Sequence, residues 1–172
     1  MTKFTRSALK TLVLFVTLSS IPVAVHAEAE CPLTRKVRFA DKVLQFKSGV
    51  PAGPDTIEYR ARIGEIFGAC ELKNGALDIK LEISFVVERG PKVDKYAFAI
   101  PYFVAVHRTS DQTLQKIAKT VDASIGRNTT AEFKSDVSEK VKVAPTDTLE
   151  NLELFIGFQL TEEQLKYNRQ SH

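Results

Sequence analysis

The sequence predicts an all-β fold: a single antiparallel β-sandwich, immunoglobulin-like in architecture, with about seven strands and a short C-terminal helix. The first observation behind this prediction is that apolar and polar residues alternate along several segments, which is the period of a half-buried strand. The second is that these segments are short and are separated by turn residues, as in sandwiches built from hairpins. The third is length, because about 145 residues remain after a predicted leader and nothing among them resembles a linker or a repeat. A closed barrel is the alternative architecture for the same pattern.

Residues 1–27 have the organisation of a secretory signal peptide. A positively charged start precedes the apolar run 12–18, which is shorter than the roughly 20 residues that span a bilayer. Val25-His26-Ala27 fits the small-x-small cleavage pattern, so we expect cleavage after Ala27 and one mature domain over 28–172. An uncleaved membrane anchor is the alternative, against which Pro22 argues. No later apolar run reaches transmembrane length.

The two cysteines, Cys31 and Cys70, are predicted to form a disulfide. Glu28, Ala29 and Glu30 precede Cys31, and their two carboxylates do not fit the small residues that a lipidation site needs, so we expect no lipid anchor. Export to an oxidising compartment favours a disulfide, which would close a loop of about 40 residues. Two buried free thiols or one shared metal site are the alternatives. Because the chain has no C-x-x-C pair and few histidines, we expect no metal.

The charge balance argues against nucleic acid as a partner. Residues 1–27 contain three of the 24 lysines and arginines and none of the 21 acidic residues, so the mature chain is close to neutral. The basic character of the whole chain therefore comes from the leader, and no basic patch is left to argue from.

Residues 56–88 predict a hairpin of two long strands. The segment 77–88 alternates strictly at first, and Asn74-Gly75 before it favours a type I′ turn. This turn sets the register, and a bulge at or near Gly64-Glu65 absorbs a slip in the apolar phase further back. The resulting partners are Leu72 with Leu77, Cys70 with Ile79, Gly68 with Leu81, Ile66 with Ile83, Ile63 with Phe85 and Arg60 with Glu88.

The remaining segments continue in strands. In 96–106 the residues expected to share one face are Tyr96, Phe98, Ile100, Tyr102, Val104 and Val106, and Pro101 indicates an edge or a bulge. Residues 114–125 fit a helix face or a strand, and their β-branched content favours a strand. Segments 131–143 and 152–160 also alternate, and a weaker strand is expected at 35–40 or 42–47.

A helix of one or two turns is predicted to begin after Thr161. Thr161 and Gln164 form a capping box, while Leu160 and Leu165 occupy the two positions of a hydrophobic staple.

Several stretches in order, CPLTRKVRFAD, EYRARI, GAC, FVVERGP, PYFVAV and IGFQLTEEQLKYNR, resemble a family of small uncharacterised envelope proteins from alphaproteobacteria, some of them lipoprotein-like. The similarity covers about residues 31–169. It implies a bacterial periplasmic setting and a pairing of the cysteines that correspond to Cys31 and Cys70. It implies no activity.

The sequence offers little catalytic chemistry. His107 lies beside Ser110 and Asp111, but adjacency along the chain does not make a catalytic triad, so we interpret this stretch as a polar turn after a strand. G-x-S-x-G, H-E-x-x-H, P-loop and G-x-G-x-x-G motifs are absent from the sequence. We therefore expect no enzyme activity and no cofactor.

The loop 88–95 is the candidate site for a partner protein. Gly90 and Pro91 make a turn, and Arg89, Lys92 and Lys95 give the loop a small basic tip. A solvated hairpin loop is the plainer interpretation, and 99–103 is a second candidate contact edge. The leading hypothesis is a non-enzymatic periplasmic module that binds another envelope protein. A small-ligand carrier with a cavity between the sheets, and an enzyme with an unrecognised site near His107, are the alternatives.

Overall fold

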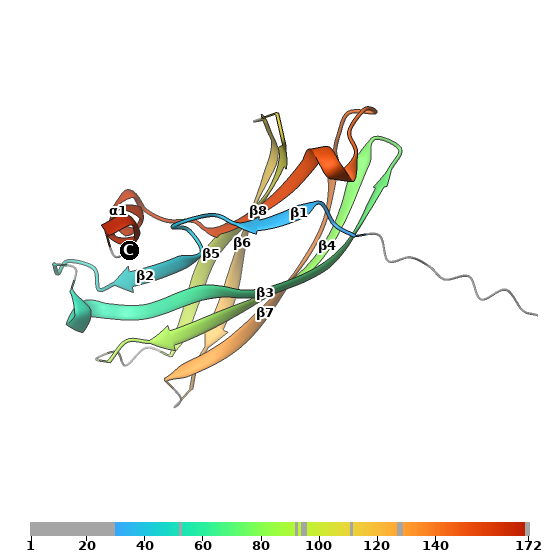
Figure 1. The fold of residues 1–172 in the computed structure, drawn as a ribbon. Helices are drawn as coiled ribbons and strands as arrows, with labels where there is room; N and C mark the ends of the chain where they lie inside the picture. The colour runs from blue at the N-terminus through green and yellow to red at the C-terminus, as the bar shows by residue number, and fades with distance from the viewer. Residues whose placement is uncertain are drawn as a thin grey trace, which may run out of the picture.

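The protein folds as a sandwich of two four-stranded β-sheets (Figure 1), in a computed structural model that describes residues 30–51, 53–91, 93, 96–110, 112–126 and 129–170. One sheet has the strand order β1-β8-β5-β6 and the other β2-β3-β4-β7. Their bounds are β1 Leu33–Lys36, β8 Leu152–Phe158, β5 Ala97–Arg108, β6 Gln112–Ser124, β2 Lys42–Phe46, β3 Ile57–Lys73, β4 Ala76–Arg89 and β7 Thr130–Lys142. The predicted leader, residues 1–27, lies outside the described residues.

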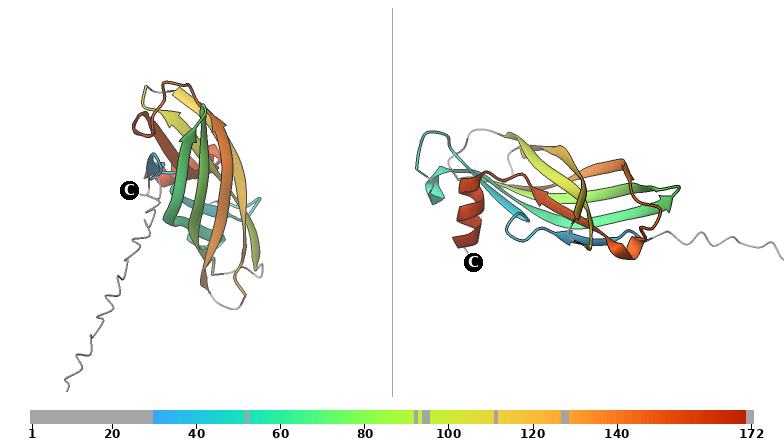
Figure 2. Two further views of the ribbon diagram at one scale, coloured as in Figure 1. Left: turned by 90° about the vertical axis from the view of Figure 1, so that its right-hand side faces the viewer. Right: turned by 90° about the horizontal axis from the view of Figure 1, so that it is seen from above.

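The predicted all-β sandwich with a short C-terminal helix is confirmed, with two differences in detail. Within the described residues eight strands form instead of about seven, because two separate strands, β1 and β2, form in the N-terminal region for which one was expected. The sandwich is also not purely antiparallel, because β1 pairs with β8 in parallel. Turned views show the two layers face to face, with long strands that twist along the molecule (Figure 2).

The hairpin of β3 and β4 has the predicted register. Asn74 and Gly75 both have positive φ, 53° and 71°, as a type I′ turn requires. Cys70 pairs with Ile79, and the register shifts between Ile63 and Ile66 at the predicted bulge. The predicted pair of Arg60 and Glu88 also forms, with an ion pair of 3.1 Å on the outer face.

Aromatic side chains fill the space between the sheets. The ring of Phe85 in β4 lies 4.9 Å from Tyr102 in β5 and 5.8 Å from Phe158 in β8, measured between centroids. At one end of the core, Tyr59 and Phe98 make a similar contact at 4.9 Å. Phe85, Tyr102 and Phe158 are each at most 1% exposed, so the two layers are joined by well-packed rings.

Pro101 lies in an interior strand, which corrects the expectation of an edge or a bulge. β5 runs between β8 and β6, and its bulge falls between Val106 and His107. Pro101 stands one residue before the β8 pairing begins, and its carbonyl accepts a hydrogen bond from Gln159 N at 3.0 Å. Both backbone polar groups of a strand residue point to the same side. The missing N–H of Pro101 therefore points beyond the end of β8 and removes no ladder bond.

The ambiguous segment 114–125 belongs to strand β6, as its β-branched content favours. It approaches β7 along one long side of the sandwich, where Lys119 and Glu139 form an ion pair of 2.5 Å. On the same side the Tyr102 hydroxyl and the Ser135 hydroxyl are 2.8 Å apart. This long side is therefore held together by polar contacts between the two sheets.

Helix α1, Glu162–Gln170, begins with the predicted capping box and closes the edge of β2 (Figure 1). Thr161 N donates to Gln164 Oε1 at 2.9 Å, and Gln164 N donates to Thr161 Oγ1 at 3.2 Å. The Gln164 side chain donates to Leu44 O at 3.1 Å. Asn168, 1% exposed, donates to Phe39 O and Lys42 O at 2.7 and 2.8 Å. Two helix amides thus satisfy carbonyls that an open sheet edge would leave unpaired.

The predicted disulfide between Cys31 and Cys70 is present, with a Cα–Cα distance of 4.6 Å. Cys70 is 2% exposed and its side chain points into the core, as the hairpin register requires. The bridge ties the segment before β1 to β3 near the C-terminal end of that strand. Among the described residues, no helix is long and apolar enough to cross a membrane.

Candidate functional site

The part of β3 beyond Arg62 is an edge of its sheet. β2 pairs with β3 only as far as Arg62, whereas β3 continues to Lys73 beside β4. Of the other edge strands in the described sheets, β2 is closed by α1, and β6 and β7 approach one another and carry mostly polar side chains. The short edge strand β1 pairs with β8 on one side and lies across from this part of β3 on the other. Sheet edges are usually blocked or charged in this way because they otherwise pair with foreign strands.

Between the bulge and the disulfide, two residues of this edge direct their backbone polar groups away from the sheet. In a two-residue hairpin the residues that flank the turn, here Lys73 and Ala76, exchange hydrogen bonds. Every second residue before Lys73 bonds to β4 in the same way, and Phe67 is one of them. Ile66 and Gly68, at the positions between, turn their N–H and C=O groups outward. No described residue pairs with these outward groups.

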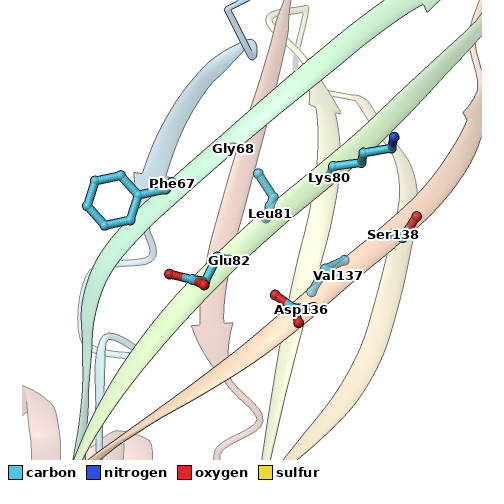
Figure 3. A pocket seen from close by; sticks show the side chains of 8 residues that line it. All are labelled: Phe67, Gly68, Lys80, Leu81, Glu82, Asp136, Val137 and Ser138. Carbon is cyan, nitrogen blue, oxygen red and sulfur yellow. The ribbon is translucent and has the colours of Figure 1, made fainter.

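The side chain between them, Phe67, is 59% exposed and has the highest exposed fraction among the exposed large apolar side chains of the described residues. Figure 3 shows its ring projecting past β3, on the side away from β4 and β7. Phe67 lines a hollow of about 530 Å³ over the outer face, together with Lys80, Glu82 and Asp136, whose side chains Figure 3 draws. Phe67 therefore stands at the border between the outer face and the edge of the sheet.

A second hollow, of about 540 Å³, lies between β1 and this edge, and we name it the β1–β3 groove. It is lined by Thr34, Lys36, Arg62, Glu65, Ile66 and Phe67, with Gly64 at the bulge. Each of its ends is held by a bond. At one end the disulfide fixes Cys31 to Cys70, and at the other Ile63 N donates to Asp41 O at 2.9 Å.

The bulge shapes the middle of the groove. Glu65 N donates to the hydroxyl of Ser84 at 2.8 Å, so a side chain of β4 replaces a ladder bond. A Cβ on Gly64 would lie 2.3 Å from that hydroxyl, and one on Gly68 would lie 2.3 Å from a Leu81 methyl group. A Cβ on Gly68 would also lie 2.7 Å from Lys80 O, so the close backbone of β4 requires glycine at that position, whereas at Gly64 the Ser84 side chain would have to move.

The charge around the groove is mainly positive. Lys36 and Arg62 line it, and Lys42 stands directly opposite Arg62 in the β2–β3 pairing. Lys36 Nζ donates to Ile63 O at 3.1 Å. Glu65 is the acidic residue of the lining. Within the described part of the chain, none of these three cations has a carboxylate partner within 4.0 Å.

In the predicted partner loop, Arg89 makes contacts inside the loop. Its Nη1 donates to Val93 O at 3.0 Å, and its guanidinium carbon lies 4.7 Å from the ring centroid of Tyr96. Tyr96 itself, expected to point inward, precedes β5 and is 46% exposed. Arg89 therefore orders this loop through a carbonyl and a ring.

The other predicted loop residues are placed only in part. Gly90 is buried and donates to Glu58 O at 2.8 Å, and a Cβ there would lie 1.8 Å from Ile57 O. Pro91 is exposed. Lys92 and Lys95 lie outside the described residues, so the basic tip stays a prediction.

His107 packs on the outer face of β5. Its ring meets Phe155 edge-on at 5.4 Å, and its register partners are Thr113 and Glu153. The carboxylate of Glu153 accepts a hydrogen bond from Arg35 at 3.2 Å. Ser110 is exposed in the following turn, and Asp111 lies outside the described residues.

The next residue, Arg108, anchors the segment before β8. Its Nε and Nη2 each donate to the Asp147 carboxylate at 2.8 Å, and Ala144 N donates to the same carboxylate at 2.7 Å. The Asp147 side chain is 2% exposed. The hydrogen bonds from Arg108 hold the pKa of Asp147 below its usual range, although burial opposes this, and the Ala144 bond adds to it.

No group of three metal-binding side chains occurs among the residues that the structure describes. Comparisons with protein-family models, curated proteins and solved structures find no match for this chain.

Proposed function

We propose that this protein is an exported periplasmic module without enzyme activity that binds another protein of the cell envelope as an accessory subunit. The observation that carries the proposal is the unpaired edge of β3, where the backbone groups of Ile66 and Gly68 point outward around the exposed ring of Phe67. Such an edge favours association with other chains, whereas among the described edge strands β2 is closed by α1 and β6 and β7 carry mostly polar side chains. The disulfide is compatible with an oxidising compartment.

The filled core supports protein binding over small-ligand transport. A carrier needs a cavity of several hundred Å³ that encloses its ligand. Phe85, Tyr102 and Phe158 meet across the middle of the sandwich, where such a cavity would lie. The two hollows that flank Phe67 instead lie at the outer face and along the edge of β3.

The direct test is recovery of a partner from the cell that makes the protein. Tagged wild-type protein, expressed from its own leader, is crosslinked in living cells and purified from the periplasmic and membrane fractions. We expect a partner in stoichiometric amount, and a periplasmic protein that begins at Glu28 without free thiols. Recovery of the protein alone from the periplasm, with turnover of a small-molecule substrate, would contradict the proposal.

A further inference from the structure

We infer that the β1–β3 groove binds an extended, acidic segment of the partner protein, which adds to β3 as a short strand. The inference rests on the proposed function and names the surface and the chemistry of what occupies it. Three features carry it: outward backbone groups, an exposed aromatic ring and surplus positive charge, all within one stretch of β3.

The backbone supplies the recognition of an extended chain. Ile66 and Gly68 each offer one N–H and one C=O on the free side of β3. The Ile66 side chain points toward the core and Gly68 has none, so no side chain at these two positions covers the groups. Because the bonds at Asp41 and at the disulfide limit the groove, the paired stretch runs over residues 64–69. At about 3.3 Å per residue this length is roughly 20 Å.

Phe67 sets the position of an apolar side chain in the partner. On one face of a sheet, side chains directly opposite one another are in contact. A partner residue opposite Phe67 would cover the ring from the open side, because β4 already places Glu82 opposite it on the other side. We therefore expect a leucine, isoleucine, valine or aromatic residue at that position of the partner strand.

The three cations near the groove determine the sign of the charge that the partner segment should carry. Lys42 and Arg62 face one another across two strands, and like charges in such pairs repel. Lys36 adds a third positive charge next to Arg62, against the single carboxylate of Glu65. A partner carboxylate would relieve this repulsion. Because β2 already occupies the position opposite Arg62, that carboxylate has to stand near the bulge, two residues from the apolar side chain and on the same face. Glu65 lies beside that position and repels a carboxylate, but the two cations of the lining, Lys36 and Arg62, outnumber it.

The test uses the full-length mature protein with its disulfide intact and a phage-displayed library of random 12-residue peptides. Peptides that bind wild-type protein are selected without reference to any variant and synthesised, and their binding is measured by calorimetry. We expect selected peptides with an acidic residue two positions from an apolar one. NMR hydrogen exchange should show the amides of Ile66 and Gly68 slowed at least tenfold by the peptide.

Three variants separate the groove from other surfaces. Phe67→Asp should weaken peptide binding at least tenfold, whereas Val50→Asp, at a side chain 45% exposed in a different loop, should change it less than twofold. Arg62→Glu should weaken binding of the acidic peptide and restore binding when the peptide carboxylate is replaced by lysine. Circular dichroism of each variant checks that the fold is kept, since all three side chains are exposed.

Several results would overturn the inference. These are peptides that bind without protecting Ile66 and Gly68, selected peptides that are basic or helical, or a wild-type homodimer in sedimentation that Phe67→Asp abolishes. The partner recovered in cells separates this inference from the proposed function. If that partner binds Phe67→Asp as tightly as the wild type, the groove is the wrong surface and protein binding stands. If neither a partner nor a peptide is found, both proposals are wrong.

Discussion

Removing the disulfide between Cys31 and Cys70 should lower stability by about 4 kcal/mol. The two cysteines are 39 residues apart, and a closed loop of that length removes chain entropy worth about 4 kcal/mol from the unfolded state at 25 °C. Domains of this size are stable by only about 5–15 kcal/mol, so the bridge represents a large share. For the predicted mature chain of about 145 residues, the expected fall in the melting temperature is roughly 10–15 °C.

The assay compares wild-type protein with the double variant Cys31→Ser/Cys70→Ala in urea. Circular dichroism follows the unfolding, because the chain has no tryptophan to serve as a fluorescent probe. Alanine at position 70 avoids placing a hydroxyl in the core, where Cys70 is 2% exposed. The dependence of the unfolding free energy on urea should become steeper, because an unbridged unfolded chain exposes more surface.

Reduced wild-type protein is the matched control, since it keeps both sulfur atoms in the core. It should lose about as much stability as the variant. A loss below about 1 kcal/mol in both, with an unchanged urea dependence, would refute the entropic reasoning. A loss in the variant alone would assign the effect to packing around Cys70.

Four further predictions concern stability. Asn168→Asp replaces a donor by a carboxylate that faces Phe39 O and Lys42 O, and urea unfolding at pH 7 should show a loss of about 3 kcal/mol. The control substitution Gln170→Glu, at an exposed position on the same helix, should change the free energy of unfolding by less than about 0.5 kcal/mol. Equal losses in the two variants would contradict the role of α1 in closing β2. Gly90→Ala forces a Cβ to within 1.8 Å of Ile57 O and should destabilise by about 2–3 kcal/mol in thermal unfolding, whereas Gly53→Ala, whose nearest neighbour is 4.0 Å away, should be almost neutral. Because the pKa of Asp147 is lowered in the folded state, its carboxylate stabilises the fold above about pH 4, and this stabilisation is lost as the pH falls through the folded-state pKa. Urea midpoints from pH 7 to 2 should therefore decline less steeply for Asp147→Asn, and parallel curves would contradict this. Burial raises the pKa of Tyr59 to about 12, so stability should be lost as the pH rises from about 10 to 12, and Tyr59→Phe should reduce that loss in alkaline titrations followed by circular dichroism.

Local features of the fold were predictable because they depend on residues close together in the chain. The Asn74-Gly75 turn sets the register of a 17-residue strand against its neighbour, and the bulge follows from a one-residue slip of the apolar phase. The start of α1 follows from Thr161 and Gln164, three residues apart. The disulfide was predictable from the count of two cysteines together with the expectation that the chain is exported.

The candidate site could be predicted from the sequence only in part. The predicted register already placed Phe67 and Ala69 on the polar outer face, opposite Glu82 and Lys80, and this is the signal that sequence reasoning missed. A single apolar residue on a solvent-exposed face is common in proteins and does not by itself indicate a binding site. An exposed apolar residue such as Phe67 indicates a binding site only where it lies beside an unpaired strand edge. The sequence does not show at which residue the pairing of β2 with β3 stops.

The sequence by itself determined the alternation that makes each strand half-buried, the turn and caps that set its ends, and the cysteine pair. The tertiary structure decided which strand ends lie beside one another: that β2 leaves β3 at Arg62, that α1 closes β2, and that β1 joins the opposite sheet. Local propensities act over a few residues, whereas the neighbours of a strand are chosen by burial and pairing between segments more than a hundred residues apart. The open edge at Ile66 and Gly68 therefore results from pairing between distant segments and not from local propensity.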